Sequence, residues 1–288
     1  MPTPVFRAAA NIVRVDTLVT DRGKPIAKLT PDDFELYDNG VRQQVTMATI
    51  EDVDIDVVLA LDTSRSVAGE RLQALRDAAG ALLKNLRDGD RAAVVTFASG
   101  VTVSAPLSSD HTAASRALEA FEGRGATALI DAAWTSVLLA HGNDRPTLVL
   151  IFSDGVDTAS WLRTSPVIAL ASRANLVVDA VVAGVASRPL TQARWNAAEA
   201  SVQPKAGPQD AGVESFLGDV TYATGGSKLD GSTGSRLEGA FVAALKEFRT
   251  RYQLSYTPTG VDGPGWHGIE VRMHRPGATI HARPGYTQ

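Results

Sequence analysis

The sequence predicts an α/β fold in which a doubly wound, mostly parallel sheet with one antiparallel edge strand stands beside a smaller β-sandwich. Three apolar runs, at residues 55–61, 147–152 and 176–183, indicate strands that are buried on both faces inside such a sheet. Helical segments separate these runs, which implies parallel pairing. Residues 10–50 and 251–288 instead show short strands and turns, so we expect these two flanks to form the sandwich together.

The N-terminal flank carries strand and turn signals. Partial alternation predicts a strand at 12–20, followed by a turn at 21–25. Thr30 is expected to cap a short helical turn that has Pro31 at its first position. Asp38-Asn39-Gly40 is a strong hairpin signal. The predicted arms of this hairpin are residues 35–37 and 43–47.

The central segment alternates helices and strands. Leucine and alanine at helical spacing predict a helix at 72–86. Strands at 91–97 and 101–107 are close enough in sequence to pair antiparallel, which gives the edge strand. Residues 186–212, with three prolines, interrupt the pattern and are expected to form an excursion or a short surface helix. Further helices are expected at 112–121, 129–139, 213–223 and 237–248, and further strands at 252–256, 268–273 and 279–282.

Composition narrows the classes of function. The chain of 288 residues has no cysteine, which excludes disulfides, thiolate zinc sites and cysteine nucleophiles. Its net charge of -4 argues against nonspecific binding to nucleic acid. No apolar run is long enough for a membrane span, and the first residues lack the basic and apolar regions of a signal peptide. A leader removed earlier would leave the same start.

Three segments carry oxygen-bearing side chains at predicted ends of strands or starts of helices. Asp62, Ser64 and Ser66 follow the first apolar strand, Thr127 lies in a glycine-hinged loop before a helix, and Asp154 follows the second apolar strand. Open α/β sheets bind ligands at the carboxyl ends of their strands, and oxygen-only ligands suit a hard cation such as Mg²⁺. Each segment alone could be a helix cap or a turn. Their joint occurrence favours one shared metal site.

Several enzyme classes fit the sequence poorly. Asp62-Thr63-Ser64 is similar to the loop of aspartic proteases, but those enzymes need a second such aspartate. A haloacid-dehalogenase phosphatase would need an aspartate where Ser64 stands. None of the five histidines lies in a serine-hydrolase or zinc motif. We therefore expect a protein that is not an enzyme, with a metal-dependent hydrolase as the remaining catalytic alternative.

The arrangement Asp62-x-Ser64-x-Ser66, Thr127 and Asp154 resembles the metal-ion-dependent adhesion site of von Willebrand factor A domains. The resemblance covers about residues 53–250 and includes all five metal-site positions. It implies a Rossmann-like fold and a bound Mg²⁺ (or Mn²⁺). Ser64, Ser66 and Thr127 would bind the ion directly or through water, while both aspartates act partly through water. One coordination position would remain for an exposed Asp or Glu of a protein partner.

The flanks are similar to those of a bacterial, often exported subgroup of these proteins. The similarity rests on Leu29-Thr30-x-x-Asp33-Phe34-x-x-Tyr37-x-Asn39-Gly40, on Tyr252-x-Leu254-x-Tyr256 and on Arg283-x-Gly285-Tyr286. It implies an extracytoplasmic location, periplasmic or secreted. The expected division is therefore 1–52 and 251–288 as the two halves of the sandwich, with the A domain at 53–250 inserted between them.

The expected function is Mg²⁺-dependent protein binding, as in adhesion, without nucleic acid and without a membrane span. The principal alternative is an assembly partner of a cytoplasmic AAA-type ATPase, a role of other bacterial von Willebrand A proteins. Arg65, Asp157 and Trp161 are the candidate residues of the ligand-binding rim. For Trp161, burial against a neighbouring helix is the competing interpretation.

Overall fold

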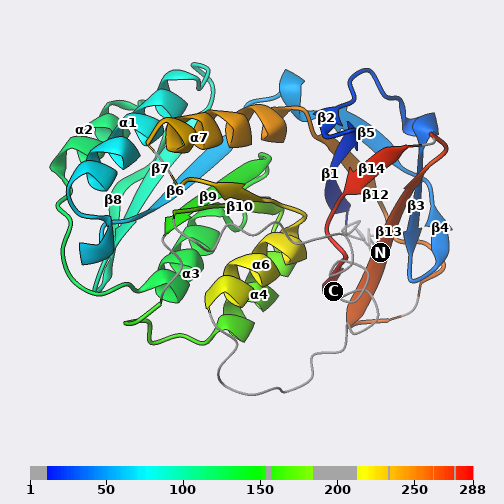
Figure 1. Cartoon of the computed structure of the whole chain (residues 1–288). Coiled ribbons are helices and arrows are strands. Elements are labelled where there is room, and N and C mark those ends of the chain that lie inside the picture. The colour runs from blue at the N-terminus through cyan, green and yellow to red at the C-terminus, as the bar shows by residue number, and fades with distance from the viewer. Residues whose placement is uncertain are drawn as a thin grey trace, which may run out of the picture.

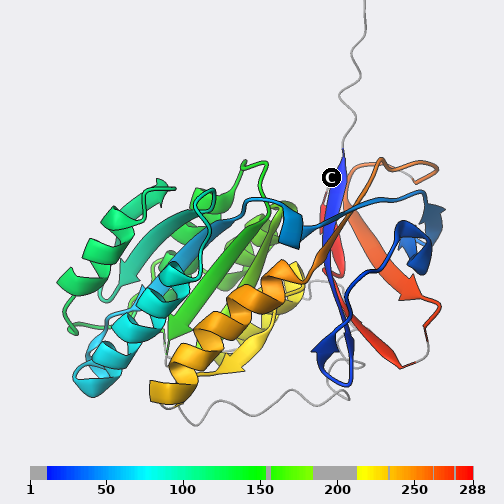
Figure 2. The same ribbon diagram turned by 90° about the horizontal axis from the view of Figure 1, so that it is seen from above.

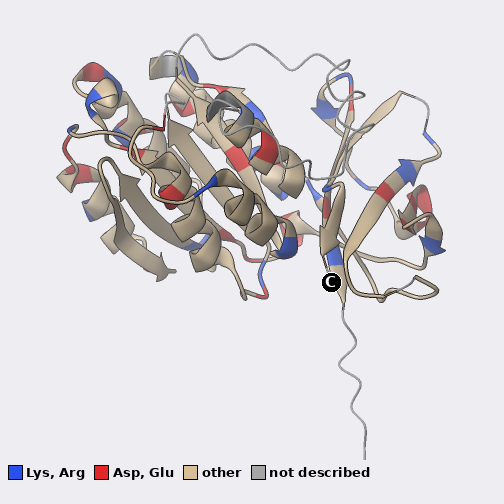
Figure 3. Cartoon of the chain, turned by 90° about the horizontal axis from the view of Figure 1, so that it is seen from below, with Lys and Arg blue, Asp and Glu red and all other residues tan. Residues whose placement is uncertain are grey.

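The computed structural model describes residues 12–153, 157–183, 213–232, 234–261, 263–275 and 277–287. These residues form an α/β part and a β part that lie side by side (Figures 1 and 2). Acidic and basic residues occur on both parts (Figure 3). Among the described helices, none is long and apolar enough to cross a membrane.

A six-stranded sheet forms the centre of the α/β part, in the order β11-β10-β9-β6-β7-β8. Neighbouring strands are parallel except β7 and β8, which pair antiparallel at one edge, as the sequence predicts. The short strand β11 at the other edge was not predicted. The strands are β6 (Asp56–Asp62), β7 (Arg91–Phe97), β8 (Val101–Ser108), β9 (Thr147–Ser153), β10 (Leu176–Val182) and β11 (Lys228–Asp230).

Helices cover both faces of this sheet (Figure 1). Helices α1, α2 and α7 pack on one face, and α3, α4 and α6 pack on the other. Helix α4 was not predicted from the sequence. The helices are α1 (Glu70–Lys84), α2 (Thr112–Ala120), α3 (Leu129–Ala140), α4 (Thr164–Arg173), α6 (Val213–Thr224) and α7 (Gly234–Arg249).

Strand β6 is apolar on both faces because each face contributes to a different core. Leu59 and Leu61 pack with residues of α1 and α7, whereas Val58 and Ala60 pack with residues of α3. Every residue of β6 is buried. The strand therefore delivers its last residue, Asp62, to a fixed place at the edge of the sheet.

Both flanks contribute strands to two antiparallel sheets, ordered β14-β1-β12-β5 and β15-β13-β3-β4, with β2 paired to β1. Strand β12 lies between β1 and β5, so Tyr252–Tyr256 pairs with two strands from the first fifty residues. Val15 and Leu254 from the first sheet share one core with Leu36 from the second. The strands are β1 (Val13–Asp21), β2 (Lys24–Pro25), β3 (Phe34–Asp38), β4 (Val41–Gln43), β5 (Thr46–Thr49), β12 (Tyr252–Tyr256), β13 (Trp266–Met273), β14 (Ala278–His281) and β15 (Gly285–Thr287).

The predicted hairpin is present, but its second arm is shorter than expected. Asn39 and Gly40 both adopt positive φ, 46° and 80°, as two-residue hairpin turns require. Strand β4 ends at Gln43, because β5 crosses to the other sheet to pair with β12. The expected excursion at 186–212 lies outside the described residues.

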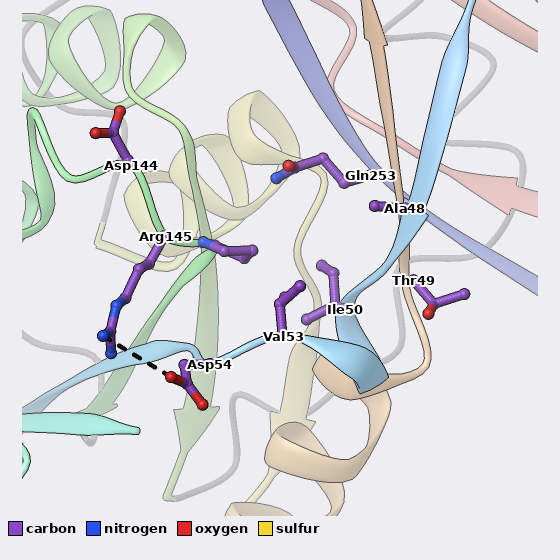
Figure 4. A pocket seen from close by; sticks show the side chains of 9 residues that line it. Ala48, Thr49, Ile50, Val53, Asp54, Asp144, Arg145 and Gln253 are labelled. Carbon is purple, nitrogen blue, oxygen red and sulfur yellow. Dashed lines mark ion pairs between the residues drawn. The ribbon is translucent and has the colours of Figure 1, made fainter. Parts of the chain in front are cut away.

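The sandwich meets the α/β part where β6 and β9 begin. Arg249, the last residue of α7, forms a buried ion pair with Asp90 there. A cavity of about 280 Å³ opens at this junction, and Asp54 and Arg145 face each other across 3.8 Å on its wall (Figure 4). The sandwich thus lies at the opposite end of the sheet from the carboxyl ends of the parallel strands.

Candidate functional site

The candidate site begins with Asp62, the last residue of the central strand β6. Its side chain is fully buried, and each carboxylate oxygen has a protein donor. The backbone N–H of Ser64 donates to Oδ1 at 2.8 Å, and the hydroxyl of Ser153 donates to Oδ2 at 2.8 Å. Ser153 ends the neighbouring strand β9. The carboxylate therefore ties the ends of two parallel strands together and fixes the start of the loop that follows β6.

Ser64 and Ser66 lie side by side on this loop, at the short 3-10 helix Arg65–Val67. Their Oγ atoms are 2.9 Å apart, with Ser64 buried and Ser66 exposed. Ligands at neighbouring corners of a Mg²⁺ octahedron are separated by about 2.8–3.0 Å, given Mg–O distances near 2.0–2.1 Å. The spacing of the two hydroxyls is therefore compatible with both oxygens on one ion.

Backbone hydrogen bonds hold a second loop against the first. The N–H of Arg65 donates to Gly125 O at 3.1 Å, and the N–H of Arg124 donates to Thr63 O at 2.9 Å. Gly125 has φ +89°, and a Cβ there would lie 2.5 Å from Ser99 Oγ, so the close approach requires glycine. Thr127, two residues further on, is 5 % exposed.

A third loop, after the end of β9, is attached to Thr127 and to the start of α3. The N–H groups of Thr158 and Ala159 donate to Thr127 O at 2.8 and 3.0 Å. The N–H of Thr127 donates in turn to Thr158 Oγ1 at 3.0 Å. Asp154, the fifth predicted ligand, lies outside the described residues. Of the four other predicted ligands, Asp62 ends β6, and Ser64, Ser66 and Thr127 lie on loops that the structure brings to the same edge of the sheet.

Asp157 and Ser160 cap α3. Asp157 Oδ1 accepts from the N–H groups of Leu129 and Ile130 at 2.8 and 3.3 Å, and Ser160 Oγ accepts from Ile130 and Asp131 at 3.0 and 3.2 Å. These are N–H groups that a helix cannot satisfy internally. The structure therefore gives Asp157, predicted as a rim residue, a capping role.

The other two predicted rim residues are at the surface. Arg65 is exposed beside Ser64 and Ser66. Trp161 is 94 % exposed, so the competing interpretation of a buried Trp161 is wrong. A cavity of about 350 Å³ adjoins this edge, between the β7–β8 hairpin and residues 120–124, and Thr63 and Arg124 line it.

The donor chemistry at this edge suits a hard, oxygen-seeking cation. The described residues contribute three hydroxyls and the carboxylate of Asp62. Within the described ranges, no group of three or more His, Asp or Glu side chains is placed to hold a metal ion. Hydroxyl-rich coordination with few carboxylates fits Mg²⁺ or Mn²⁺, which keep several waters, better than it fits zinc or calcium.

The sequence does not predict the hydrogen bonds that Ser153 and Ser160 form at the site. Ser153 directly precedes Asp154 and ends β9, one position after the pair Phe152 and Leu61, so it lies beside Asp62 of β6. The sequence alone does not give this register. For Ser160 the sequence holds no signal, because its partners Ile130 and Asp131 are about thirty residues away.

Comparisons with known proteins agree with the fold. Residues 57–156 match the family model of the von Willebrand factor type A domain. No curated protein sequence matches the chain. An aerotolerance-related membrane protein from Bacteroides fragilis has 16% identity and a TM-score of 0.51, covering 67% of this chain and 98% of its own. BatB from Bacteroides thetaiotaomicron has 15% identity and a TM-score of 0.50, with the same coverage. Proximal thread matrix protein 1 from the mussel byssus, solved with a zinc-occupied metal-ion-dependent adhesion site, has 15% identity and a TM-score of 0.54, covering 74% and 50%.

Proposed function

We propose that this chain is a Mg²⁺-dependent protein-binding module and not an enzyme. Its ion would be held by Asp62, Ser64, Ser66, Thr127 and Asp154. The observation that carries the proposal is the convergence of three hydrogen-bonded loops at the carboxyl edge of one parallel sheet. The match to the von Willebrand factor type A family supports it, since such domains commonly mediate protein interactions.

The charge at the site indicates what the ion would bind. Three of the proposed ligands are neutral hydroxyls, and Asp62 already accepts hydrogen bonds from Ser64 and Ser153. With the aspartates acting partly through water, the ion would keep net positive charge in its inner coordination shell and supply an open position for an anionic oxygen. An Asp or Glu side chain of a partner protein fits this requirement. The cavity beside Thr63 and Arg124 offers space for the partner residues that flank such a carboxylate.

Contacts of the histidines support binding over catalysis. His111 contacts the Asp90 carbonyl, His267 contacts Asp38, and His274 contacts Glu35. All three contacts lie away from Ser64 and Ser66. In the described ranges, the Oγ atoms of Ser64 and Ser66 pair with each other at 2.9 Å and not with a histidine base of the kind that activates a nucleophile.

An extracytoplasmic location remains part of the proposal and rests on the resemblance of the flanks. Fractionation of cells that express the full-length gene tests it. The protein should be recovered outside the cytoplasm, and recovery only with cytosolic markers would contradict this part alone.

Calorimetric titration with Mg²⁺ tests the metal site. Ser64→Ala should weaken Mg²⁺ binding by about tenfold or more, because one coordinating oxygen is lost. Ser104→Ala is the matched control, because Ser104 Oγ pairs with Thr96 Oγ at 2.8 Å and not with any of the proposed ligands. Equal affinity of the wild type and Ser64→Ala would contradict the assignment.

A further inference from the structure

The inference concerns Trp161, whose side chain is 94 % exposed, by far the largest exposure of any large apolar side chain among the described residues. Trp266, on the sandwich, is 44 % exposed and is the only other tryptophan among these exposed side chains. Full exposure of an indole leaves its whole apolar surface in water. Burial of such a surface against a partner is a large source of binding free energy.

The backbone beneath Trp161 is fixed. Asp131, in the first turn of α3, accepts from the N–H groups of Trp161 and Leu162 at 3.0 and 2.9 Å. The same loop caps α3 in return through Asp157 and Ser160. This reciprocal arrangement holds the loop on a rigid helix, so little backbone entropy would be lost when a partner covers the indole.

Trp161 and the candidate metal ligand Thr127 belong to one hydrogen-bonded unit. Thr158 and Ala159, two to three residues before Trp161, donate to Thr127 O. The position of the indole is therefore linked through the backbone to the position of the proposed ion. A partner that reaches the ion lies next to the loop that presents the indole.

Charged side chains at this edge favour an acidic partner. Arg65, Arg124 and Arg163 are exposed there, and only Arg124 has an ion-pair partner among the described contacts, Glu122 at 3.6 Å. The carboxylates of Asp131 and Asp157 point inward to backbone N–H groups. The outward charge of these loops is therefore mainly positive, which complements an acidic protein surface.

We propose that Trp161 is the aromatic anchor of the ligand-binding face, and that the partner is a protein segment with an acidic side chain for the ion and an apolar pocket for the indole. This inference rests on the proposed function and extends it. A lipid surface fits less well. The other exposed large apolar side chains of the described residues lie on the sandwich or its linker, on β8, or, for Leu138, at the far end of α3. None of these side chains would enter a bilayer together with Trp161.

A metal-eluted peptide selection provides a defined probe. A phage library of twelve-residue random peptides with one fixed Asp is bound to the immobilised full chain in Mg²⁺ and eluted with chelator. The dissociation constants of the eluted peptides are then measured for the wild type, Trp161→Ala, Trp161→Phe and the matched control Trp266→Ala. Circular dichroism verifies that each variant is folded.

Trp161→Ala should raise the dissociation constants of the eluted peptides by about tenfold or more, and Trp161→Phe should restore part of the affinity. Trp266→Ala should change these dissociation constants by less than about twofold. Mg²⁺-dependent peptides that bind Trp161→Ala as well as the wild type would overturn this inference and leave the proposed function intact. Failure to elute any peptide with chelator would contradict the proposed function itself. Chelator-insensitive binding to phosphatidylglycerol vesicles that is lost in Trp161→Ala would assign the indole to a membrane and also overturn the inference.

Discussion

Replacement of Asp38 tests how much the buried hydrogen bonds of one carboxylate stabilise the sandwich. Asp38, at the end of β3, is fully buried in the sandwich. Its Oδ1 lies 2.9 Å from His267 Nδ1, and its Oδ2 accepts from the hydroxyls of Tyr256 and Tyr286 at 2.8 and 3.0 Å. Tyr256 belongs to one sheet, and His267 and Tyr286 belong to the other. One carboxylate thus joins the two sheets.

The charge state of His267 follows from its two partners. Nδ1 faces the Asp38 carboxylate and Nε2 lies 2.9 Å from the Gly263 carbonyl, so both ring nitrogens face acceptors and both must donate. Burial alone would lower the pKa of His267. The hydrogen bond to Gly263 and the hydrogen bond and charge of Asp38 outweigh burial, and the net effect raises this pKa. Burial and the bond to Asp38 also raise the pKa of Tyr286 to about 12, so its hydroxyl remains a donor.

Asp38→Ala leaves three buried donors without an acceptor. The free energy of unfolding should fall by about 4 kcal/mol. Each tyrosine hydroxyl accounts for about 1 kcal/mol and the histidine, which can lose its proton, for about 2 kcal/mol. Asp38→Asn should cost about 1–2 kcal/mol, because an amide can still accept from a tyrosine and donate to a neutral His267.

Urea unfolding measures both losses as changes in the free energy of unfolding. Asp32→Ala, at an exposed aspartate of the same part, is the control and should change stability by less than about 0.5 kcal/mol. A loss below about 1 kcal/mol for Asp38→Ala, or equal losses for the alanine and asparagine variants, would refute the reasoning.

Two further predictions concern pH and the loop that holds Thr127. Since the pKa of His267 is raised in the folded state, its stabilising contribution is complete below about pH 6.5 and is lost as pH rises through the folded-state pKa. In urea unfolding across this pH range, the free energy of unfolding of the wild type should fall as pH rises, and that of Asp38→Asn should fall less. Identical pH profiles of the two proteins would contradict a protonated His267 bound to Asp38. Asp157→Ala removes an acceptor from the start of α3, so it should lower the free energy of unfolding by about 1 kcal/mol and also weaken Mg²⁺ binding through Thr127. Unfolding and calorimetry together check this, and unchanged Mg²⁺ affinity would show that the loop does not position Thr127.

The features that could be predicted from the sequence are those encoded locally. Residues 57–61 of β6 are all apolar because both faces of the strand are buried, so the sequence predicts a place for this strand in the middle of the sheet. The sequence predicts the hairpin at Asn39 and Gly40 because its turn needs positive φ at two consecutive positions, and few residue types adopt positive φ. Asp62, Ser64 and Ser66 could be grouped into one candidate site from the sequence because they lie within five consecutive positions.

The features that were not predicted depend on contacts between distant residues. No local pattern links His267 to its partner Asp38, which is 229 positions away. Asp157 was assigned to the rim because nothing local shows that it caps a helix 28 residues earlier. Strand β11 has only three residues and forms through pairing with β10. The exposure of Trp161 depends on how its loop lies on α3, which no local pattern reports.

Crystals of the protein grown with Mn²⁺ and analysed by anomalous difference maps test the central claim most directly. The account predicts one Mn²⁺ peak at the carboxyl edge of the sheet, within about 2.0–2.4 Å of Ser64 Oγ and Ser66 Oγ, or one water away from them, with Thr127 on the same ion. The peak should be absent in crystals of Ser64→Ala. A peak elsewhere in the wild type, or an undiminished peak at this edge in Ser64→Ala, would contradict the claim that these hydroxyls form the metal site.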